Sequence, residues 1–266
     1  MRMNDKPKDL RAFLERKTAE YNRVSFVAGD PISIPHSFSK PQDIEIAAFF
    51  TAIFSWGNRT TIIRKSQELM TLMDHAPYQF VRQHTDHDLK RLLNFRHRTF
   101  NATDLLYFIA FFHHHFDRYD SLEDAFLLPW EKAGPPSDGW QAEQALSAFY
   151  HYFFSLDDVP PRTRKHIASP EKHSSCKRIN MFLRWMARTD HQGVDFGLWR
   201  RIPPARLICP LDLHVARVAR RFGLLTRTQS DWLAALELTG HLRQLDPADP
   251  TKYDFALFGL GSMEKF

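Results

Sequence analysis

Glycine and cysteine are both scarce in this sequence, and each shortage excludes a class of protein. Only 10 of the 266 residues are glycine, which excludes a collagen-like or glycine-looped architecture. The two cysteines, Cys176 and Cys209, cannot form a disulfide framework or a four-cysteine iron–sulfur site. The longest apolar run, residues 105–112, is far shorter than the roughly 20 residues that cross a bilayer. With no apolar leader behind the charged N-terminus, we expect a cytoplasmic protein with no membrane partner.

The composition is otherwise that of a globular protein. Hydrophobic residues make up 43% of the chain and charged residues 25%, and the length fits one large domain or two small ones. Phenylalanine is unusually frequent, with 23 residues, and supplies most of the aromatic residues for a core. The net charge of +5 and the isoelectric point near 9.2 are compatible with a polyanionic partner, but a solvated basic surface has the same charge.

Apolar residues recur at helical spacing along almost the whole chain, and no segment alternates in the manner of a β-strand. The sequence therefore predicts an all-α protein with eight to twelve helices. Residues 41–55 are apolar nearly all round, which is typical of a helix buried at the centre of its domain. Residues 133–139, rich in glycine and proline, predict a loop and a candidate boundary between subdomains. The other expected helices cover residues 8–23, 60–73, 78–84, 86–94, 103–119, 141–155, 175–188, 212–222, 230–244 and 253–260.

One predicted helix begins close to a lysine. Ser174 or Ser175 is suited to cap its N-terminus, which places Lys177 in the first turn. A cation is poorly located there because the helix macrodipole is positive at this end. An amine that must be neutral to act as a nucleophile is well located, and the free backbone amides of the turn can bind a phosphate. The alternative interpretation is that Lys177 is a solvated surface residue.

A second predicted helix begins at an aspartate. Asp212 follows a Cys-Pro-Leu segment and is suited to cap a helix that ends at Gly223. One face of this helix is apolar, and arginines project from the other face. The alternative interpretation is that Asp212 only caps the helix and that the arginines only contact solvent. The arginines are Arg217, Arg220 and Arg221.

Together, the two helix starts resemble a known superfamily. Residues 210–222 begin with proline, an apolar residue, aspartate, any residue and His-Val, and they continue as a basic amphipathic helix. This segment is similar to the catalytic-aspartate segment of the helix-hairpin-helix DNA glycosylases. Lys177 stands where the bifunctional members carry their nucleophilic lysine, and its separation of 35 residues from Asp212 is most similar to the archaeal 8-oxoguanine glycosylase branch. The whole chain also resembles a family of uncharacterised bacterial proteins.

The resemblance covers residues 41–261 and implies two helical subdomains with the active site in the cleft between them. Residues 1–40 are then an N-terminal helix and linker, and residues 41–266 form the glycosylase-like core, with the hairpin at about residues 163–189. The chain departs from the superfamily in two segments. The hairpin segment 170–175 has no glycine, and Gly57 or Asn58 stands where the superfamily often has glutamine.

The resemblance also implies roles for individual residues. Lys177 and Asp212 are the implied catalytic pair. Asp254 and Phe258, one helical turn apart, are similar to the acid and the aromatic residue that grip the base in the archaeal branch, and Trp56 completes the implied base pocket. Residues 53–59 resemble the segment that enters the minor groove beside the target base. The implied DNA contacts are Ser55, Asn58, Arg59, Ser174, Ser175, Arg178, His214 and Arg217.

These roles imply a bifunctional DNA glycosylase and AP lyase that excises an oxidised purine, with 8-oxoguanine as the first candidate. The damaged base is flipped out, Lys177 attacks C1′, Asp212 stabilises the positive charge on the sugar, and β-elimination follows. The implied partner is duplex DNA with a damaged base, bound by a monomer in the nucleoid without a cofactor. Two alternatives stay open: a non-catalytic nucleic-acid-binding protein of the same fold, and an enzyme that acts on RNA or on another lesion.

We expect no metal site. His113, His114 and His115 are consecutive, so on a helix they point about 100° apart and cannot bind one ion together. The basic run at residues 162–166 lies just before Lys177, where it either contacts phosphates or forms an ordinary surface loop.

Overall fold

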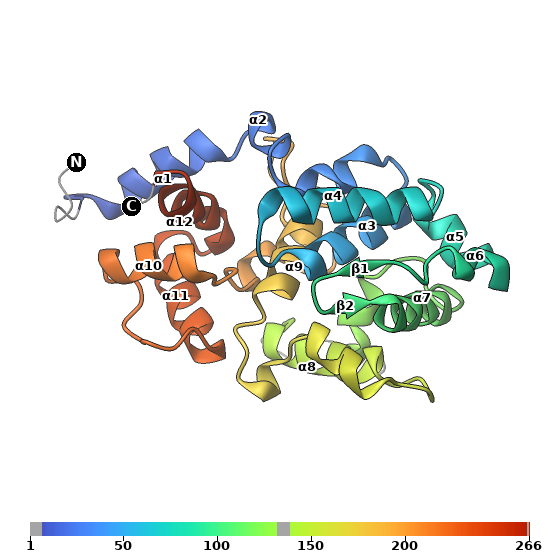
Figure 1. Cartoon of the computed structure of the whole chain (residues 1–266). Coiled ribbons are helices and arrows are strands. Elements are labelled where there is room, and N and C mark those ends of the chain that lie inside the picture. Colours follow the sequence, from blue (N-terminus) through green and yellow to red (C-terminus); the bar gives the residue numbers. More distant parts are fainter. Residues whose placement is uncertain (1–6, 132–138, 265) are drawn as a thin grey trace. The chain divides into compact units, whose positions relative to one another are not determined.

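The computed structural model describes residues 7–131, 139–264 and 266, and the loop expected at 133–139 lies outside the described residues except for Gly139. Helices account for 62% of the chain and strands for 2%, which confirms the all-α class (Figure 1). Within the described part, no helix is both long and apolar enough to cross a membrane. The chain divides into two compact units: unit 1 comprises residues 1–28 and 169–266, and unit 2 comprises residues 29–168.

Unit 2 is built around helix α3 (Pro41–Phe54). Every residue of α3 from Ile44 onward is buried, which confirms the prediction of a central helix. The ring of Phe49 packs against phenylalanines of α7 (Ala102–Phe116) and of α8 (Ala142–Phe153). Burial of one such ring contributes about 1.5–3 kcal/mol. The most deeply buried phenylalanines of unit 2 are Phe49, Phe50, Phe54, Phe100, Phe108, Phe111, Phe112, Phe126, Phe149 and Phe153.

Unit 2 also contains one short β-hairpin that the sequence did not predict. Strand β1 (Arg96–His97) pairs antiparallel with β2 (Phe100–Asn101). Each strand has only two residues, too few for an alternating pattern to be visible in the sequence. The helix expected at 86–94 stops at Lys90 and gives way to a turn. The remaining helices of unit 2 are α4 (Arg59–Leu72), α5 (Pro77–Gln83) and α6 (Asp86–Lys90).

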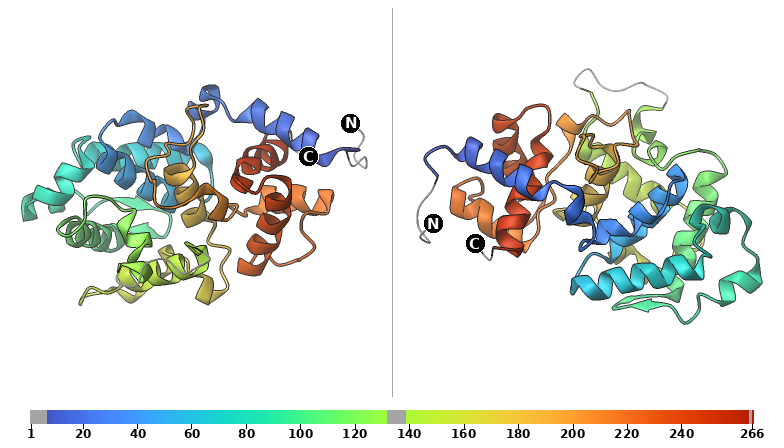
Figure 2. Two further views of the ribbon diagram at one scale, coloured as in Figure 1. Left: turned by 180° about the vertical axis from the view of Figure 1, so that it is seen from behind. Right: turned by 90° about the horizontal axis from the view of Figure 1, so that it is seen from above.

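In unit 1, α12 (Tyr253–Ser262) packs against both α1 (Leu10–Tyr21) and α10 (Leu213–Phe222), and Figure 2 shows α1 alongside α12. Two glycines allow this close packing. A Cβ at Gly259 would collide with the ring of Tyr21, and a Cβ at Gly261 would lie 2.8 Å from a backbone oxygen of α10. The other helices of unit 1 are α2 (Val24–Val27), α9 (Lys177–Ala187) and α11 (Trp232–Leu245).

Candidate functional site

The segment that leads into α9, residues 173–176, makes a tight turn without glycine. His173 and Cys176 have φ angles of 55° and 51°, in the left-handed region that costs a residue with a side chain roughly 1–2 kcal/mol. Ser174 holds the turn, because its hydroxyl accepts a hydrogen bond from Cys176 N at 3.2 Å and its carbonyl accepts one from Cys176 Sγ at 3.3 Å. Trp232 N donates to the carbonyl of His173 at 3.4 Å. The absence of glycine therefore does not prevent the turn.

The serine cap expected for α9 is not formed. Cys176 is the N-cap residue, and its side chain makes no capping hydrogen bond. The left-handed turn at Cys176 separates the serines from the helix, and Ser175 Oγ instead donates to the carbonyl of Leu211 at 3.4 Å. This bond joins the residue two before Lys177 to the residue directly before Asp212. The starts of α9 and α10 therefore lie together within unit 1.

Asp212 caps α10 as predicted. Its Oδ1 accepts a hydrogen bond from Val215 N at 2.9 Å, and Gly223, with a φ of 74°, ends the helix. The side chain is half-buried, and within the described part of the chain Oδ2 makes no hydrogen bond. One carboxylate oxygen thus fixes the side chain, and the other is available for a ligand.

Asp254 on α12 is a buried acid of the site. Its side chain is paired with Nη1 of Arg184, and the residue is 6% exposed. Burial raises the pKa of Asp254 to about 6, and the negative charges of Asp212 and Asp195 act in the same direction, whereas the positive charges of Arg184 and Lys177 oppose them. The four charges all lie close enough to Asp254 to affect its titration. The site therefore contains a carboxyl that exchanges its proton near neutral pH.

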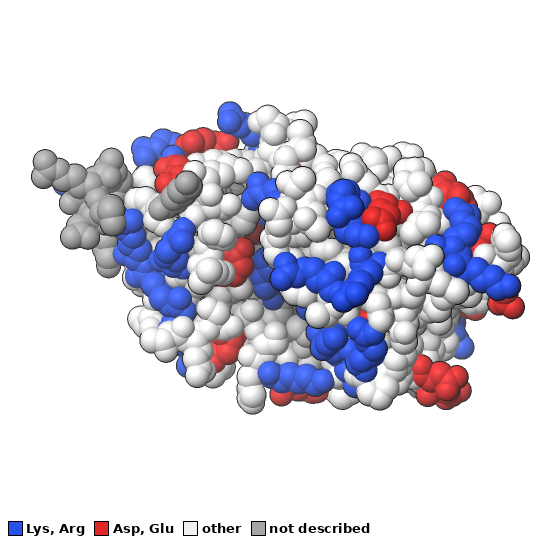
Figure 3. Space-filling model, in the orientation of Figure 1, with Lys and Arg blue, Asp and Glu red and all other residues white. Residues whose placement is uncertain are grey.

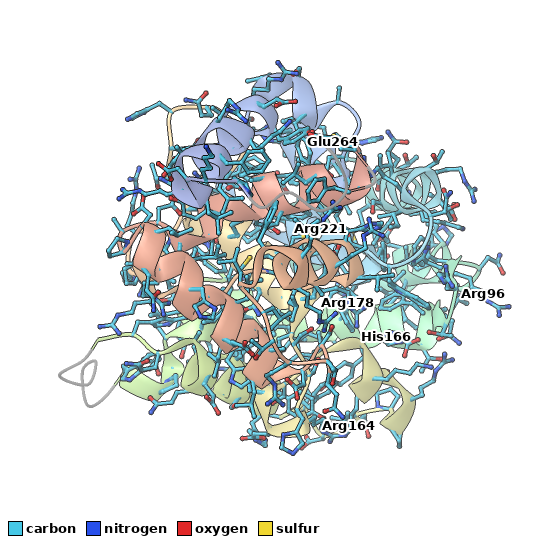
Figure 4. All side chains as sticks on the ribbon, turned by 90° about the vertical axis from the view of Figure 1, so that its left-hand side faces the viewer. Arg96, Arg164, His166, Arg178, Arg221 and Glu264 are labelled. Carbon is cyan, nitrogen blue, oxygen red and sulfur yellow. The ribbon has the colours of Figure 1, made fainter. Side chains whose placement is uncertain are left out.

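Lys177 is the first residue of α9 and is half-buried. Among the residues that the structure describes, its Nζ has no hydrogen-bond or ion-pair partner. This is unusual, because a lysine that loses water normally gains a carboxylate partner. The next residue, Arg178, is also half-buried and extends from the first turn (Figure 4), and burial lowers its pKa. The amine of Lys177 therefore lies in an acidic neighbourhood without being tied to one carboxylate.

Arg184 is a site residue that the sequence analysis missed. It lies seven residues after Lys177, so two helical turns bring it to the same face of α9. Its Nε lies 3.4 Å from Asp195, and its guanidinium lies 4.3 Å from the ring centre of Phe255. Arg188, one turn further, lies 2.9 Å from the same Asp195. The spacing of Lys177 and Arg184 was the signal available in the sequence, but Asp254, one of the two buried acids that Arg184 pairs with, lies 70 residues further along the chain.

Neither cysteine of unit 1 is suited to act as a nucleophile. Burial raises the pKa of Cys209 well above its ordinary value, and the negative charge of Asp254 adds to this effect. Burial likewise raises the pKa of Cys176 to about 12. Both thiols are therefore protonated at neutral pH, and a protonated thiol is a weak nucleophile.

Phe258, His214 and Arg217 gather where α12 meets α10. The rings of Phe258 and His214 meet edge to face, with centroids 6.3 Å apart. His214 Nδ1 lies 3.2 Å from the carbonyl oxygen of Gly261, and Arg217 Nη2 donates to the same oxygen at 2.6 Å. Phe258 lies one turn after Asp254, so the two residues of the predicted pair are in the same region as the start of α10. Arg217, by contrast, is engaged in closing the end of α12.

The predicted site residues of segment 55–59 belong to unit 2. Ser55 is buried, and its hydroxyl donates to an α3 carbonyl one turn earlier at 2.8 Å. Trp56 is half-buried, with the guanidinium of Arg98 4.3 Å from its ring centre. Asn58 caps α4 by accepting a backbone hydrogen bond at 3.1 Å, and Arg59 is the first, half-buried residue of that helix. Local contacts within unit 2 account for the conformation of this segment.

Comparison with known proteins identifies one family. The family profile described as "Protein of unknown function (DUF2400)" matches residues 30–263. The chain belongs to the DUF2400 family. Searches of curated proteins and of solved structures found no match. The matched region contains Lys177, Asp212 and Asp254, so the whole cluster lies within the DUF2400 part of the chain.

In this DUF2400 protein the cluster combines a lysine amine without an ion pair, a carboxylate with one available oxygen, and a buried acid. A nucleophilic amine beside groups that exchange protons and offset positive charge is suited to covalent catalysis at a sugar or carbonyl carbon. Within the described ranges, no group of three or more His, Cys, Asp or Glu side chains is arranged to hold a metal ion.

Proposed function

We propose that this protein is a bifunctional DNA glycosylase and AP lyase of the helix-hairpin-helix type, which excises an oxidised purine such as 8-oxoguanine. The observation that carries the proposal is the half-buried amine of Lys177, which has no ion-pair partner among the described residues and lies near Asp212 and Asp254. The sequence resemblance supplies the class of lesion. The cluster supplies the nucleophile and the counter-charge that such a reaction needs.

The backbone of the hairpin also supports the proposal. The superfamily usually has glycines in this turn, which tolerate the left-handed region. Here His173 and Cys176 occupy that region without being glycine. The tight turn is thus kept although the segment has no glycine. The missing glycines therefore give less support to the alternative of a non-catalytic nucleic-acid-binding protein.

In the proposed reaction, the amine of Lys177 attacks C1′ of the damaged nucleotide. The Nζ–C1′ bond forms as the glycosidic bond breaks, and the base leaves with the electron pair and takes up a proton. The carboxylate of Asp212 stabilises the positive charge that develops on the sugar. Opening of the sugar ring gives a Schiff base, and loss of a C2′ proton then expels the 3′ phosphate. Asp254 is suited to accept or supply one of these protons, since its pKa is about 6.

Borohydride trapping on a panel of lesion duplexes tests the proposal. Wild-type protein is expected to form a covalent adduct on a duplex with an oxidised purine. Lys177→Gln is expected to form none, because an amide cannot form the Schiff base, while its affinity for the duplex stays within a few-fold. Lys172→Gln, an exposed lysine of the same hairpin, is the matched control and is expected to trap like the wild type.

Trapping by Lys177→Gln at the wild-type level would contradict the assignment of the nucleophile. Binding of every duplex without any trapping by the wild type would contradict an enzymatic role and identify a non-catalytic nucleic-acid-binding protein. Trapping only on RNA or on another lesion would retain the chemistry and correct the substrate.

A further inference from the structure

Unit 2 holds one arginine rigidly at the tip of its β-hairpin. Arg98 has a φ of 55°, and its guanidinium covers Trp56, 4.3 Å from the ring centre. Gly57 makes this contact possible, because a Cβ at that position would collide with Arg98 Nη1. The edge of His97 packs against the same tryptophan, with centroids 6.1 Å apart. Three features therefore fix the position of the exposed Arg98 side chain: its backbone conformation, the lack of a side chain at Gly57 and the stacking on Trp56.

Two further arginines are oriented by the backbone of the same turn. Arg96 Nε donates to the carbonyl of Arg98 at 3.2 Å, and Arg162 Nη2 donates to the carbonyl of Thr99 at 2.7 Å. All three arginines are exposed. They come from β1, from the hairpin turn and from a segment about 60 residues later. Lysine and arginine side chains gather over β1 and β2 and beside α4 (Figure 3). We call the arginines at positions 96, 98 and 162 the hairpin-tip arginines.

Little negative charge opposes this surface. The pKa of the buried His97 is lowered by burial first, and then by the positive charges of Arg98, Lys65 and Arg64. The three side chains are thus close enough to His97 to affect its titration, and Lys65 is itself paired with Glu68 at 2.7 Å. Asp104, in the first turn of α7 directly after the hairpin, is completely buried. It lies 3.3 Å from Arg162 and leaves Arg96 and Arg98 without a carboxylate partner among the described residues.

We propose that the hairpin-tip arginines bind the phosphate backbone of duplex DNA, as a second contact separate from the Lys177 cluster. Guanidinium groups bind phosphate oxygens in a forked arrangement, and groups that are already fixed lose less entropy on binding. Binding of single strands through base stacking requires an exposed aromatic ring. Here Trp56 is covered by Arg98, and Phe95 and Phe100 are 2% and 1% exposed. The contact therefore recognises phosphates and is independent of sequence.

This inference rests on the proposed function for the identity of the partner, so its test measures binding to undamaged DNA, where no reaction takes place. The affinity for a labelled duplex is measured by fluorescence anisotropy at several salt concentrations. Arg96→Gln/Arg98→Gln is expected to weaken binding about tenfold or more at low salt. It is also expected to reduce the slope of log affinity against log salt by about 2, since each lost phosphate contact removes roughly 0.9.

The matched control removes the same charge elsewhere on unit 2. Arg82 and Arg91 are arginines of the α5–α6 region that pair with Asp117 and Asp74. Arg82→Gln/Arg91→Gln is expected to leave the salt slope unchanged. Equal losses of slope in the two double variants would overturn the inference, because they would reflect net charge alone. An unchanged slope in Arg96→Gln/Arg98→Gln would overturn it as well.

A single variant tests whether misfolding of the β1–β2 hairpin explains the loss of binding. Arg98→Gly removes one charge but suits the positive φ of this position, so the turn is retained. Its salt slope is expected to fall by about 1. If Lys177→Gln still formed the borohydride-trapped adduct, the salt slopes of the arginine variants would not change. The two proposals can therefore be contradicted independently.

Discussion

Two buried aspartates, Asp104 of unit 2 and Asp254 of unit 1, have opposite surroundings. In unit 2, Asp104 is 0% exposed and is supplied with donors on every side. It accepts hydrogen bonds from Asn101 N at 2.9 Å and from Thr163 Oγ1 at 2.8 Å, and His166 Nε2 lies 3.2 Å away. In unit 1, Asp254 has one partner within the described part of the chain, Arg184.

The pKa values of the two carboxyls reflect this difference in the number of hydrogen-bond donors around them. Burial raises the pKa of Asp104, but the donors from His166, Asn101 and Thr163 outweigh burial and bring it below the ordinary value of 3.8. Burial raises the pKa of Asp254 to about 6, and the neighbouring acids contribute to the increase. A buried acid with several donors is a structural element. A buried acid with one donor and like charges beside it is typical of a functional site.

The largest expected effect is the loss of stability in Asp104→Asn. An amide cannot accept all the hydrogen bonds that the carboxylate accepts, so the variant leaves the buried donors of Thr163 and His166 without an acceptor and the exposed Arg162 without a counter-charge. We expect a loss of about 1–3 kcal/mol in the free energy of unfolding for each buried donor left without an acceptor, measured by urea denaturation. Asp254→Asn is the matched change in unit 1 and is expected to cost less than about 1 kcal/mol at pH 7, because its carboxyl is costly to ionise. Equal losses would remove the distinction between the two acids.

Asp212→Asn tests the functional side of the comparison. Asparagine is as good a helix cap as aspartate, so α10 and the overall stability are retained. The counter-charge to the sugar is lost, and the rate of base release is expected to fall by about 10²–10³-fold. Single-turnover cleavage of a lesion duplex measures this rate. A variant with the wild-type rate would show that Asp212 serves only as a cap.

The pH dependence of stability is expected to have opposite signs for the two acids. The folded-state pKa of Asp254 lies above its unfolded value, so its contribution is complete below pH 4 and is lost as the pH rises through about 6. Between pH 4 and pH 7 the wild type therefore loses up to about 3 kcal/mol relative to Asp254→Asn. The folded-state pKa of Asp104 is lowered, so its contribution is present above pH 4 and is lost below it. Denaturation curves of both variants against wild type at several pH values measure the two trends.

Local patterns predicted the helices well. The apolar segment 41–55 corresponds to α3 at Pro41–Phe54, because a helix that is apolar all round is evident in any short window. The β1–β2 hairpin was missed because its support is not local. The carbonyl of Thr99 is bonded by Arg162, and the hairpin ring Phe100 packs against His166, more than 60 residues later.

The site was predictable only in part, for the same reason. Asp212 was identified by its position before an amphipathic helix, and the structure confirms it as the cap. The prediction of a serine cap for α9 was wrong, because the left-handed conformation of Cys176 shifts the start of the helix. A cysteine in the sequence does not indicate such a conformation. Arg184 and Asp195 were missed because a charged residue in a helix or loop is ordinarily exposed, and only the tertiary fold buries these two.

The proposed mechanism requires one covalent bond, between Nζ of Lys177 and the sugar. The direct measurement is peptide mapping of the borohydride-trapped protein by mass spectrometry, after digestion of the protein and of the DNA. We predict a single modified peptide that carries the reduced sugar remnant on Lys177. A remnant on another lysine, or on the N-terminal amine, would contradict the proposed mechanism.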